Sequence, residues 1–385
     1  MSRFADRTGP IRLGMVGGGQ DAMIGSIHRI AARLDGHYHL VAGALSSTED
    51  KARASAEAIG LPRDRTYTDY VEMAKREARL KDGIEAVAVV VPNHMHLPVA
   101  REFLKRGIHV ICDKPLTGTL ADAKKLAKAA EQSDAQFILT HNYTGYPLVR
   151  EAQARVARGD LGDIRVVQVE YAQDWLAEVP APDNKQAAWR TDPERSGAGG
   201  ATGDIGTHAF NLLRFVTGLV PTALAADLQA FVPGRALDDN AHVMLRFDGG
   251  ARGMLWCSQV AAGKENALTL RVFGTKAGLE WRQEESNRLL VTPLGGATEI
   301  VTRASAATSD GSRRLTRTPP GHPEGFLEAF ANIYGEAAQA IRAARTGASV
   351  PEGVTFPTIA DGVEGVSFVD ACVRSSKRDA AWVKP

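Results

Sequence analysis

The strongest constraint on the fold of this chain is the alternation of short apolar segments with helix-like segments before residue 141. Alternation of this kind predicts right-handed βαβ units on a parallel sheet. The segment 86–91 is apolar and rich in valine, which is typical of a strand buried on both faces. We therefore predict an α/β fold with a doubly wound parallel sheet. Its expected strands are 11–16, 39–45, 86–91, 109–112 and 136–140.

The pattern changes after residue 141. Strand-like segments then follow one another with short polar connections, which predicts a mostly antiparallel sheet and a second domain of the α+β class. We expect domains at 1–141 and 142–385, and two domains also suit a chain of 385 residues. The polar connection 303–322 is long for a compact domain, so we expect it to be mobile or functional. The expected elements are strands 164–173, 224–232, 241–247, 254–260, 268–273, 279–281, 289–292 and 299–302, with helices at 204–217 and 325–345.

Composition excludes several classes of protein. Lys and Arg total 46 against 45 Asp and Glu, and this near-neutral balance argues against a dedicated nucleic-acid binder. The three cysteines, Cys112, Cys257 and Cys372, are far apart, which argues against a disulfide framework and a cysteine-built zinc site. The first ten residues are unlike a signal peptide, and no apolar run approaches the roughly 20 residues of a membrane helix. We expect a cytoplasmic protein.

A glycine-rich turn follows the first expected strand. Gly17-Gly18-Gly19 leads into a helix-like segment, and the amides and helix dipole at such a turn can hold a pyrophosphate. A strict GxGxxG pattern would need glycine at position 22, where Ala22 stands, and the next glycine is Gly25. The turn therefore carries about three extra residues. It indicates either a nucleotide site or a tight turn without a ligand.

The end of the second expected strand leaves the choice of cofactor open. An Asp or Glu there would bind ribose hydroxyls and favour NAD. This chain has Ser46 and Ser47, whose hydroxyls can bond either a ribose or a 2′-phosphate. Ser47 is equally well explained as the N-cap of the next helix, with Asp50 as its capping-box partner.

Two further turns follow expected parallel strands, where doubly wound folds bind ligands. Pro92-Asn93-His94-Met95-His96 contains an HxH pair, but no obvious third metal ligand accompanies it. In Asp113-Lys114-Pro115, a partly desolvated Lys114 could donate to a substrate hydroxyl and share in proton transfer. A surface salt bridge between Lys114 and Asp113 is the alternative.

The most informative local segment is the glycine-rich stretch that ends in Asp204 and His208. Their i, i+4 spacing on a helix would place both side chains on one face. An imidazole beside a carboxylate suits general acid–base chemistry, although a buried structural pair is the alternative. The glycines before the pair would permit a ligand to approach the helix N-terminus.

In this order, the motifs resemble the Gfo/Idh/MocA oxidoreductase family over nearly the whole chain. There are two departures. Asp113 stands where the family usually has Glu in a Glu-Lys-Pro motif, and the Ser46-Ser47 corner leaves the choice of NAD or NADP open. Three segments resemble the branch that contains levoglucosan and cyclitol dehydrogenases. They are the insertion after the glycines, residues 189–193 and residues 321–325. The matching motifs are Gly17–Gly19 with His28, Pro92-Asn93 with His96, Asp113-Lys114-Pro115, Asn142, 159–164, Asp204 with His208, and 273–278.

The resemblance implies an N-terminal Rossmann domain and a C-terminal α+β domain with a large open-faced sheet. It implies hydride transfer between a secondary alcohol of a sugar or cyclitol and NAD or NADP, with Lys114, Asp204 and His208 as the catalytic group. His208 or Lys114 would take the hydroxyl proton. The alternatives are an NADPH-dependent reductase of a keto- or anhydro-sugar and a catalytically silent nucleotide-binding protein. A metal-dependent hydrolase that uses His94, His96, Asp204 and His208 is a third.

The resemblance also implies contacts and assembly. We expect a homodimer or homotetramer formed through the C-terminal sheet. The expected cofactor contacts are Gly17, Gly19, Gln20, Ile24, Ser46, Ser47, Pro92, Asn93, His96, Asp113, Lys114 and Asn142. The expected substrate contacts are Lys114, Tyr143, Gln173, Trp175, Arg190, Asp204, His208 and His322.

Overall fold

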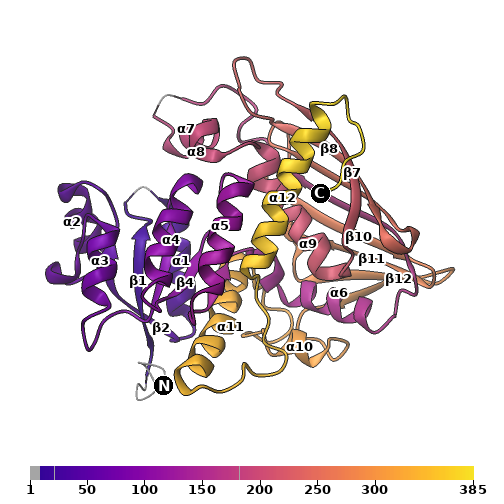
Figure 1. Ribbon diagram of the computed structural model, residues 1–385. Helices are drawn as coiled ribbons and strands as arrows, with labels where there is room; N and C mark the ends of the chain where they lie inside the picture. The colour runs from indigo at the N-terminus through magenta and orange to yellow at the C-terminus, as the bar shows by residue number, and fades with distance from the viewer. Residues whose placement is uncertain (1–8, 21, 182) are drawn as a thin grey trace. The chain divides into compact units, whose positions relative to one another are not determined.

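The computed structural model describes residues 9–20, 22–181 and 183–385, which form two compact units (Figure 1). The first unit contains the chain up to Thr117, Ala121–Asn142 and Leu327–Val363. The second contains Gly118–Leu120, Tyr143–Phe326 and Glu364–Pro385. The domains expected at 1–141 and 142–385 differ from this division mainly in Leu327–Val363, which returns to the first unit, and in smaller exchanges at Gly118–Leu120 and Asn142. Helical periodicity shows that a segment has an apolar face, but not which sheet that face covers.

The first unit is built on a five-stranded parallel sheet in the order β2-β1-β3-β4-β5. Every residue of the central strands β3 and β4 is buried, which explains their continuous apolar sequences. This sheet confirms the predicted doubly wound α/β fold. The strands are β1 Ile11–Gly17, β2 Tyr38–Ala44, β3 Ala86–Val90, β4 His109–Cys112 and β5 Phe137–Leu139.

Helices cover both faces of this sheet. The β1–β2 crossover runs in the opposite direction to the later crossovers, so right-handed connections put α1 on one face and the following helices on the other. Helix α11 shares the α1 face, since Phe330 meets His28 edge-on at 5.3 Å. The helices are α1 Met23–Leu34, α2 Glu49–Ala58, α3 Tyr70–Glu77, α4 His96–Leu104, α5 Leu120–Glu131 and α11 Phe326–Thr346.

The start of α2 differs from the prediction. Its N-cap is Thr48 rather than Ser47, and no side chain caps the helix. The predicted capping box with Asp50 is therefore wrong. Ser46 instead accepts a hydrogen bond from the Thr48 backbone N–H at 3.3 Å, so the chain turns once more before the helix begins.

The second unit is built on an eight-stranded sheet in the order β13-β12-β11-β10-β6-β9-β8-β7. All neighbouring strands are antiparallel except β6 and β9, which are parallel. The mostly antiparallel sheet is confirmed, but it is not a simple meander because its first strand in sequence lies in the middle. The strands are β6 Ile164–Ala172, β7 Pro221–Gln229, β8 Asn240–Phe247, β9 Arg252–Ser258, β10 Ala267–Gly274, β11 Ala277–Arg282, β12 Arg288–Pro293 and β13 Glu299–Thr302.

The two faces of this sheet differ. Along β6, Val167, Val169 and Tyr171 are buried, whereas Val166 on the opposite face is exposed. The helices α6 Pro147–Ala157, α9 Thr207–Thr217 and α12 Ile359–Ser376 lie over the buried face (Figure 1). We call the opposite face the outward face.

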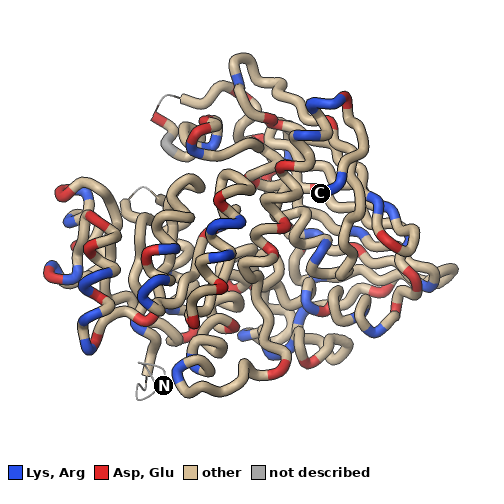
Figure 2. The backbone as a smooth tube through the Cα atoms, viewed as in Figure 1, with Lys and Arg blue, Asp and Glu red and all other residues tan. Residues whose placement is uncertain are grey.

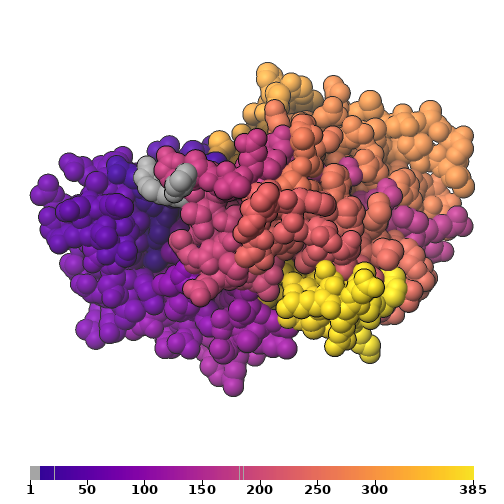
Figure 3. All heavy atoms as spheres, turned by 90° about the horizontal axis from the view of Figure 1, so that it is seen from above, coloured from indigo at the N-terminus to yellow at the C-terminus, as the bar shows by residue number. Residues whose placement is uncertain are grey.

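The end of the chain closes the β7 edge of the second unit. Val383 forms an antiparallel bridge with Leu224, and the guanidinium of Arg246 lies 3.8 Å from the centre of the Trp382 ring. In Figure 3 the C-terminal part of the chain forms a yellow patch on the surface of the second unit.

Charge is evenly distributed along the chain. Figure 2 shows basic and acidic residues interspersed in both units, as expected from the near-neutral composition. In the part of the chain that the structure describes, no helix has the length and apolarity needed to span a membrane.

Candidate active site

The glycine-rich turn has the geometry of a nucleotide-binding turn despite its irregular spacing. Gly17 and Gly18 have φ angles of 77° and 66°, which favour glycine. A Cβ on Gly25 would lie 2.2 Å from the Gly18 carbonyl oxygen. Gly25 thus permits the close helix–strand packing that the third glycine of the regular motif provides. The extra residues lengthen the loop without removing this contact.

A cavity of ≈ 400 Å³ lies beside this turn. The first turn of α1 has Ala22 as its N-cap and no side-chain cap, so a phosphate could accept from its amides. Ser55 Oγ accepts a hydrogen bond from the Gln20 backbone N–H at 3.0 Å. Arg29 also lines the cavity, and burial lowers the pKa of its guanidinium. The lining residues are Gly19, Gln20, Ala22, Met23, Ser26, Arg29, Ser55, Ala58 and Ile59.

The expected cofactor contacts around this turn differ in exposure. Gln20 and Ser47 are exposed, whereas Ile24 and Ser46 are half-buried. The sequence did not single out Ser55 or Arg29, which come from the middle of helices and carry no local signal of a ligand.

The loop after β3 places its two histidines differently. His94 is exposed and His96 is fully buried. The His96 ring has Nδ1 2.8 Å from the Pro115 carbonyl oxygen and Nε2 2.9 Å from that of Val91. Burial lowers the pKa of His96, although Asp113 and the carbonyls act in the opposite direction. His96 therefore ties the turn that carries Lys114 to the end of β3.

No group of three potential metal-binding His, Cys, Asp or Glu side chains occurs among residues 9–20, 22–181 and 183–385. The predicted loop contacts Pro92 and Asn93 are half-buried and buried, respectively.

Lys114 follows β4 in a turn organised by Asp113. Asp113 Oδ1 accepts hydrogen bonds from the Lys114 backbone N–H and from Thr140 Oγ1, both at 2.9 Å. Burial alone would raise the pKa of Asp113, but interactions with His28, Lys114 and His96 hold it well below its ordinary range. The Asp113 carboxylate is thus a largely buried anion that shapes the turn.

Two residues after β5 complete the first half of the site. Burial, followed by the charge of Lys114, lowers the pKa of His141 to about 3, so its imidazole is neutral at physiological pH. Asn142 is buried, and its Nδ2 has no hydrogen-bond partner within the described chain. A buried amide without an acceptor is costly, so this group fits the predicted contact with a cofactor.

In the second unit, Asp204 lies in a π-helical turn, Thr202–Gly206, immediately before α9. The predicted α-helical i, i+4 geometry of Asp204 and His208 is therefore altered by this wider turn. Such turns frequently occur at functional sites. Asp204 Oδ2 accepts from Arg190 Nε at 3.2 Å and from Gln259 Nε2 at 3.0 Å.

Two of the glycines before Asp204, Gly197 and Gly200, admit the chain itself. A Cβ on Gly197 would lie 2.2 Å from the Gly118 carbonyl oxygen, and one on Gly200 would lie 2.0 Å from that of Asp238. The Asp238 carboxylate accepts from the Gly200 and Thr202 N–H groups at 2.7 and 2.8 Å. This carboxylate therefore caps the start of the helical segment.

His208 lies against aromatic and amide side chains of the same unit. Its ring centroid is 4.8 Å from that of Tyr143 and 6.2 Å from that of Tyr171. Asn266 Oδ1 accepts from the Tyr171 hydroxyl and from Gln173 Nε2, both at 2.7 Å. His208 thus lies beside two tyrosine rings, one of which is hydrogen-bonded through Asn266 to Gln173.

These side-chain contacts continue to Trp175. Trp175 Nε1 donates to Gln173 Oε1 at 3.0 Å, and the Arg190 guanidinium lies 5.8 Å from the Trp175 ring centre. Most of the predicted substrate contacts of this unit are thus linked to one another. His322 takes no part in the contacts that join these described side chains.

His322 is exposed, and its carbonyl accepts a hydrogen bond from Arg303. Arg303 is buried and pairs with buried Glu324 at 3.0 Å. The connection expected to be mobile or functional is therefore organised around an internal ion pair.

Sequence reasoning missed several residues of the second half. Tyr171 could have been found, because it lies two residues before Gln173 on the same face of a strand. Asn266, Gln259 and Asp238 could not, since they lie just outside the ends of strands that are far away in sequence.

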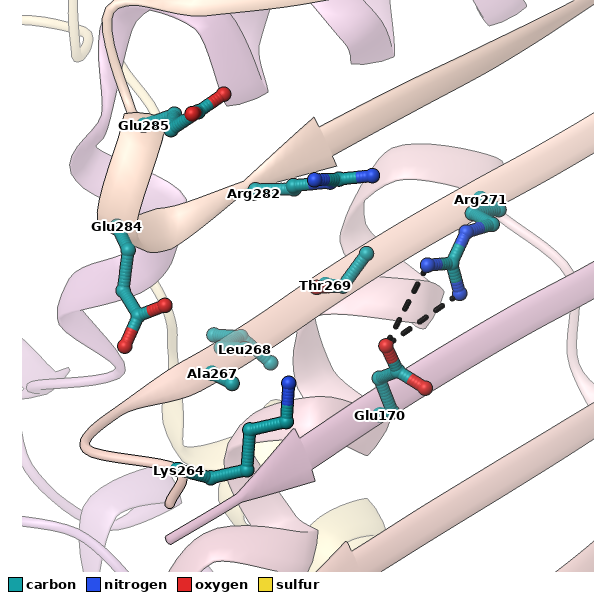
Figure 4. A pocket seen from close by; sticks show the side chains of 9 residues that line it. All are labelled: Glu170, Lys264, Ala267, Leu268, Thr269, Arg271, Arg282, Glu284 and Glu285. Atoms are coloured by element: carbon teal, nitrogen blue, oxygen red, sulfur yellow. Dashed lines mark hydrogen bonds and ion pairs between the residues drawn. The ribbon is translucent and has the colours of Figure 1, made fainter.

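A second cavity, of ≈ 490 Å³, lies on the outward face of the second unit's sheet (Figure 4). Arg271 pairs with Glu170 at 3.4 Å inside it. Because Glu170 and Tyr171 are successive residues of β6, this cavity and His208 lie on opposite faces of the sheet. It is lined by Glu170, Lys264, Ala267, Leu268, Thr269, Arg271, Arg282, Glu284 and Glu285.

Comparison with known proteins gives two family matches. Residues 11–152 match the oxidoreductase family with an NAD-binding Rossmann fold, and residues 149–280 match the GFO/IDH/MocA C-terminal domain. The chain is 33% identical over 380 residues to the uncharacterized oxidoreductase YfiI of Bacillus subtilis, covering 97% of both chains. It is 27% identical over 401 residues to levoglucosan dehydrogenase of Pseudarthrobacter phenanthrenivorans, again covering 97% of both.

Solved structures are similar over nearly their full length. An oxidoreductase from Sinorhizobium meliloti is 59% identical, with a TM-score of 0.90 over 98% of this chain and 100% of that one. An inositol dehydrogenase homolog from Azotobacter vinelandii, complexed with NADH and myo-inositol, is 36% identical, with a TM-score of 0.93 over 100% of both chains.

Proposed function

Because the chain belongs to the Gfo/Idh/MocA family of NAD-binding oxidoreductases, we propose that it transfers a hydride between a secondary alcohol of a sugar or cyclitol and NAD or NADP. The observation that best supports this chemistry is the Lys114 turn. An ammonium is placed at the carboxyl end of a buried parallel strand, beside an ionised Asp113 and a neutral His141. That is where doubly wound folds bring substrate and cofactor together.

The residues of the first unit fit a dinucleotide. The first-turn amides of α1 would hold its pyrophosphate, and Asn142 Nδ2 would donate to the cofactor. When bound, the nicotinamide supplies the hydride acceptor or donor. The protein contributes position and charge to the reaction.

We assign proton transfer to His208, with Lys114 polarising the substrate oxygen. In the oxidative direction, His208 would take the O–H proton of the carbinol while the C–H hydrogen left as hydride to a bound nicotinamide, and a carbonyl would remain. Asp204, held by Arg190 and Gln259, would stabilise the imidazolium that forms. In the reductive direction, the same groups return the proton.

The side chains around His208 favour a neutral polyhydroxylated substrate. Phenol and amide groups of Tyr143, Gln173 and Asn266 offer both donors and acceptors to hydroxyls. Trp175 offers an apolar surface for the C–H face of a ring. Levoglucosan dehydrogenase and the myo-inositol complex among the relatives suggest an anhydro-sugar or cyclitol.

The test is formation of reduced cofactor, measured by absorbance, with a panel of pyranoses, anhydro-sugars and inositols and with either NAD or NADP. Lys114→Ala and His208→Ala should each lose at least about a hundredfold in kcat, since general acid–base groups contribute roughly that much. Both variants should still bind cofactor in a fluorescence titration. Lys264→Ala, on the outward face, is the matched control and should turn over normally. Undiminished turnover in both site variants would refute the assignment.

We further propose that the outward face joins two copies of the chain. Met244 and Met254 lie opposite each other on β8 and β9 and are 54% and 48% exposed. The same face carries both signs of charge, as in the Arg271–Glu170 pair, so it can complement a second copy of itself.

A further inference from the structure

A buried chain of polar groups connects α11 to the turn that carries Lys114. His28 of α1 is fully buried, and its Nδ1 lies 2.8 Å from the Tyr334 hydroxyl. Its other ring nitrogen, Nε2, lies 3.8 Å from Asp113 Oδ1. Phe330 and Tyr334 meet the imidazole edge-on and fix the plane of the ring. All of these residues belong to the first unit.

The contacts of His28 orient both of its ring nitrogens. Nε2 has no hydrogen-bond partner among the described groups, yet it faces a carboxylate held in its ionised form. A hydrogen on Nε2 therefore turns the positive edge of the ring toward Asp113, whereas a lone pair there would be repelled. The Tyr334 hydroxyl can either donate to Nδ1 or accept from it, so it holds this nitrogen whichever hydrogens the ring carries. Tyr334 thus fixes the orientation in which Nε2 of His28 faces Asp113.

Asp113 passes this constraint to the neighbouring turn. The oxygen that faces His28, Oδ1, also accepts from the Lys114 N–H and from Thr140. A change in the position or charge of Asp113 would therefore alter both the backbone and the electrostatic environment of Lys114.

We propose that Tyr334 and His28 are positioning residues of the reaction, which hold Asp113 as a fixed carboxylate and, through it, the turn that carries Lys114. This inference rests on the proposed role of Lys114. It also assigns a function to two buried residues, Tyr334 and His28. Among the predicted cofactor and substrate contacts, their polar contacts lead only to Asp113. The gap of 3.8 Å is what the short arm of Asp leaves, and a Glu would extend the arm by about 1.5 Å.

Other titratable groups surround this chain of contacts. Tyr38 of β2 donates from its hydroxyl to the Tyr334 carbonyl oxygen at 3.0 Å and also faces Arg342 and Arg345. His96 of α4, His141 after β5 and Cys112 of β4 are close enough to interact electrostatically with Asp113. The contributions of His96, His141 and Cys112 are common to wild type and to the variants below, so they cancel in the comparison, and the Tyr38 hydroxyl is tested by its own variant.

The experiment compares Tyr334→Phe with Tyr38→Phe. Each removes one buried phenol hydroxyl from the same cluster, but only Tyr334→Phe removes the hydroxyl that meets His28 Nδ1. Acetylation of the Lys114 amine by dilute acetic anhydride is measured by mass spectrometry between pH 6 and 10 on cofactor-free protein. The pH dependence of kcat and the KM for the alcohol are measured alongside, and thermal denaturation confirms that both variants are folded.

Tyr334→Phe should acetylate roughly three- to tenfold faster at a fixed pH below 9, because a displaced or protonated Asp113 no longer stabilises the ammonium form. Its kcat should fall about tenfold with little change in KM, and its pH profile should move. Tyr38→Phe should match wild type in labelling and in pH profile. Asp113→Asn, which removes the charge at constant shape, should label at least as fast as Tyr334→Phe. In an Asp113→Glu background, whose longer arm reaches His28, the effect of Tyr334→Phe should shrink to about twofold or less.

Equal labelling of Tyr334→Phe and Tyr38→Phe would overturn the proposal, since the effect would then be one of packing. Wild-type labelling in Asp113→Asn would also overturn it, because Asp113 would not influence Lys114. If the labelling pattern is as expected but no alcohol is oxidised by the wild-type protein, the proposed function fails while the contacts to Lys114 are upheld. The two failures are therefore distinguishable.

Discussion

His141 should make the stability of this protein depend on pH between neutrality and mild acid. Its imidazole is buried beside Lys114, and its pKa is lowered from 6.5 to about 3. In that interval the unfolded chain binds a proton at His141 that the folded chain does not. Stability due to this group is therefore fully present above pH 6.5 and is lost as the pH falls toward 3. His141→Gln removes the titration while keeping a polar side chain.

The magnitude follows from the two pKa values. At pH 5 the protonation of the unfolded state costs the folded state about 2 kcal/mol, and at pH 7 it costs only about 0.2 kcal/mol. Wild type should thus lose about 2 kcal/mol more than His141→Gln when the pH is lowered from 7 to 5. His96, whose pKa is also lowered by burial, contributes equally to both proteins and cancels.

The assay is urea unfolding of both proteins at pH 7 and pH 5, with the free energy of unfolding extrapolated to water. His94→Gln is the matched control, because His94 is exposed, and it should follow wild type at both pH values. Lys114→Met should weaken the pH dependence, since the lysine charge is one cause of the lowered pKa. A wild-type loss that equals the loss in His141→Gln would refute the assignment of a neutral, buried imidazole beside Lys114.

Two further predictions concern the second unit. Asp238→Asn should lower the free energy of unfolding by about 2–4 kcal/mol, because an amide cannot accept all of the hydrogen bonds made by this buried carboxylate. Thr202→Val removes only one of these hydrogen bonds and should lower the free energy of unfolding by about 1 kcal/mol. Urea unfolding measures both, and equal losses would contradict the capping role. Met254→Glu on the outward face should shift the protein to monomer in light scattering, while Val350→Glu, exposed in the first unit, should leave the assembly unchanged. A monomeric wild type would rule out the proposed interface.

The sequence predicts the elements of this fold well because their signals are local. Every residue of β3 is buried, and its sequence is accordingly apolar and rich in valine. Along most of β8, buried and exposed positions alternate, and the type of side chain alternates with them. Segment 299–302 matches β13, and 109–112 matches β4. The position of β6 between β10 and β9 has no such signal, because pairing partners are chosen across long separations in sequence.

The candidate site shows the same limit. Lys114, Asp204 and His208 are found from motifs, whereas the groups that hold them are not. Asn266 reaches Tyr171 from the start of another strand, and Tyr334 reaches His28 across 306 residues of sequence. Such partners satisfy buried polar atoms wherever the fold brings them, so their spacing in sequence carries no pattern.

Glycine-rich sequence also has more than one physical cause. Near Gly25, the absence of a side chain lets a helix approach the turn that would hold a phosphate. Near Gly200, it lets the chain approach Asp238, whose carboxylate occupies the helical amides that a ligand would need. The two stretches look alike in sequence and differ only in which group occupies the space.

The return of α11 to the first unit explains why a fragment that ends at residue 141 would not form an independent domain. Glu85 is fully buried, and one of its oxygens lies 2.7 Å from Arg345 Nη2 of α11. The Leu139 N–H of β5 donates to the Pro357 carbonyl oxygen at 2.8 Å, so the last parallel strand also depends on this segment. Without it, a buried carboxylate would lose a cation and β5 would lose an edge contact, both of which are strongly destabilising. The same segment supplies Tyr334, so the turn that carries Lys114 reaches its final form only after the chain has passed through the second unit and come back.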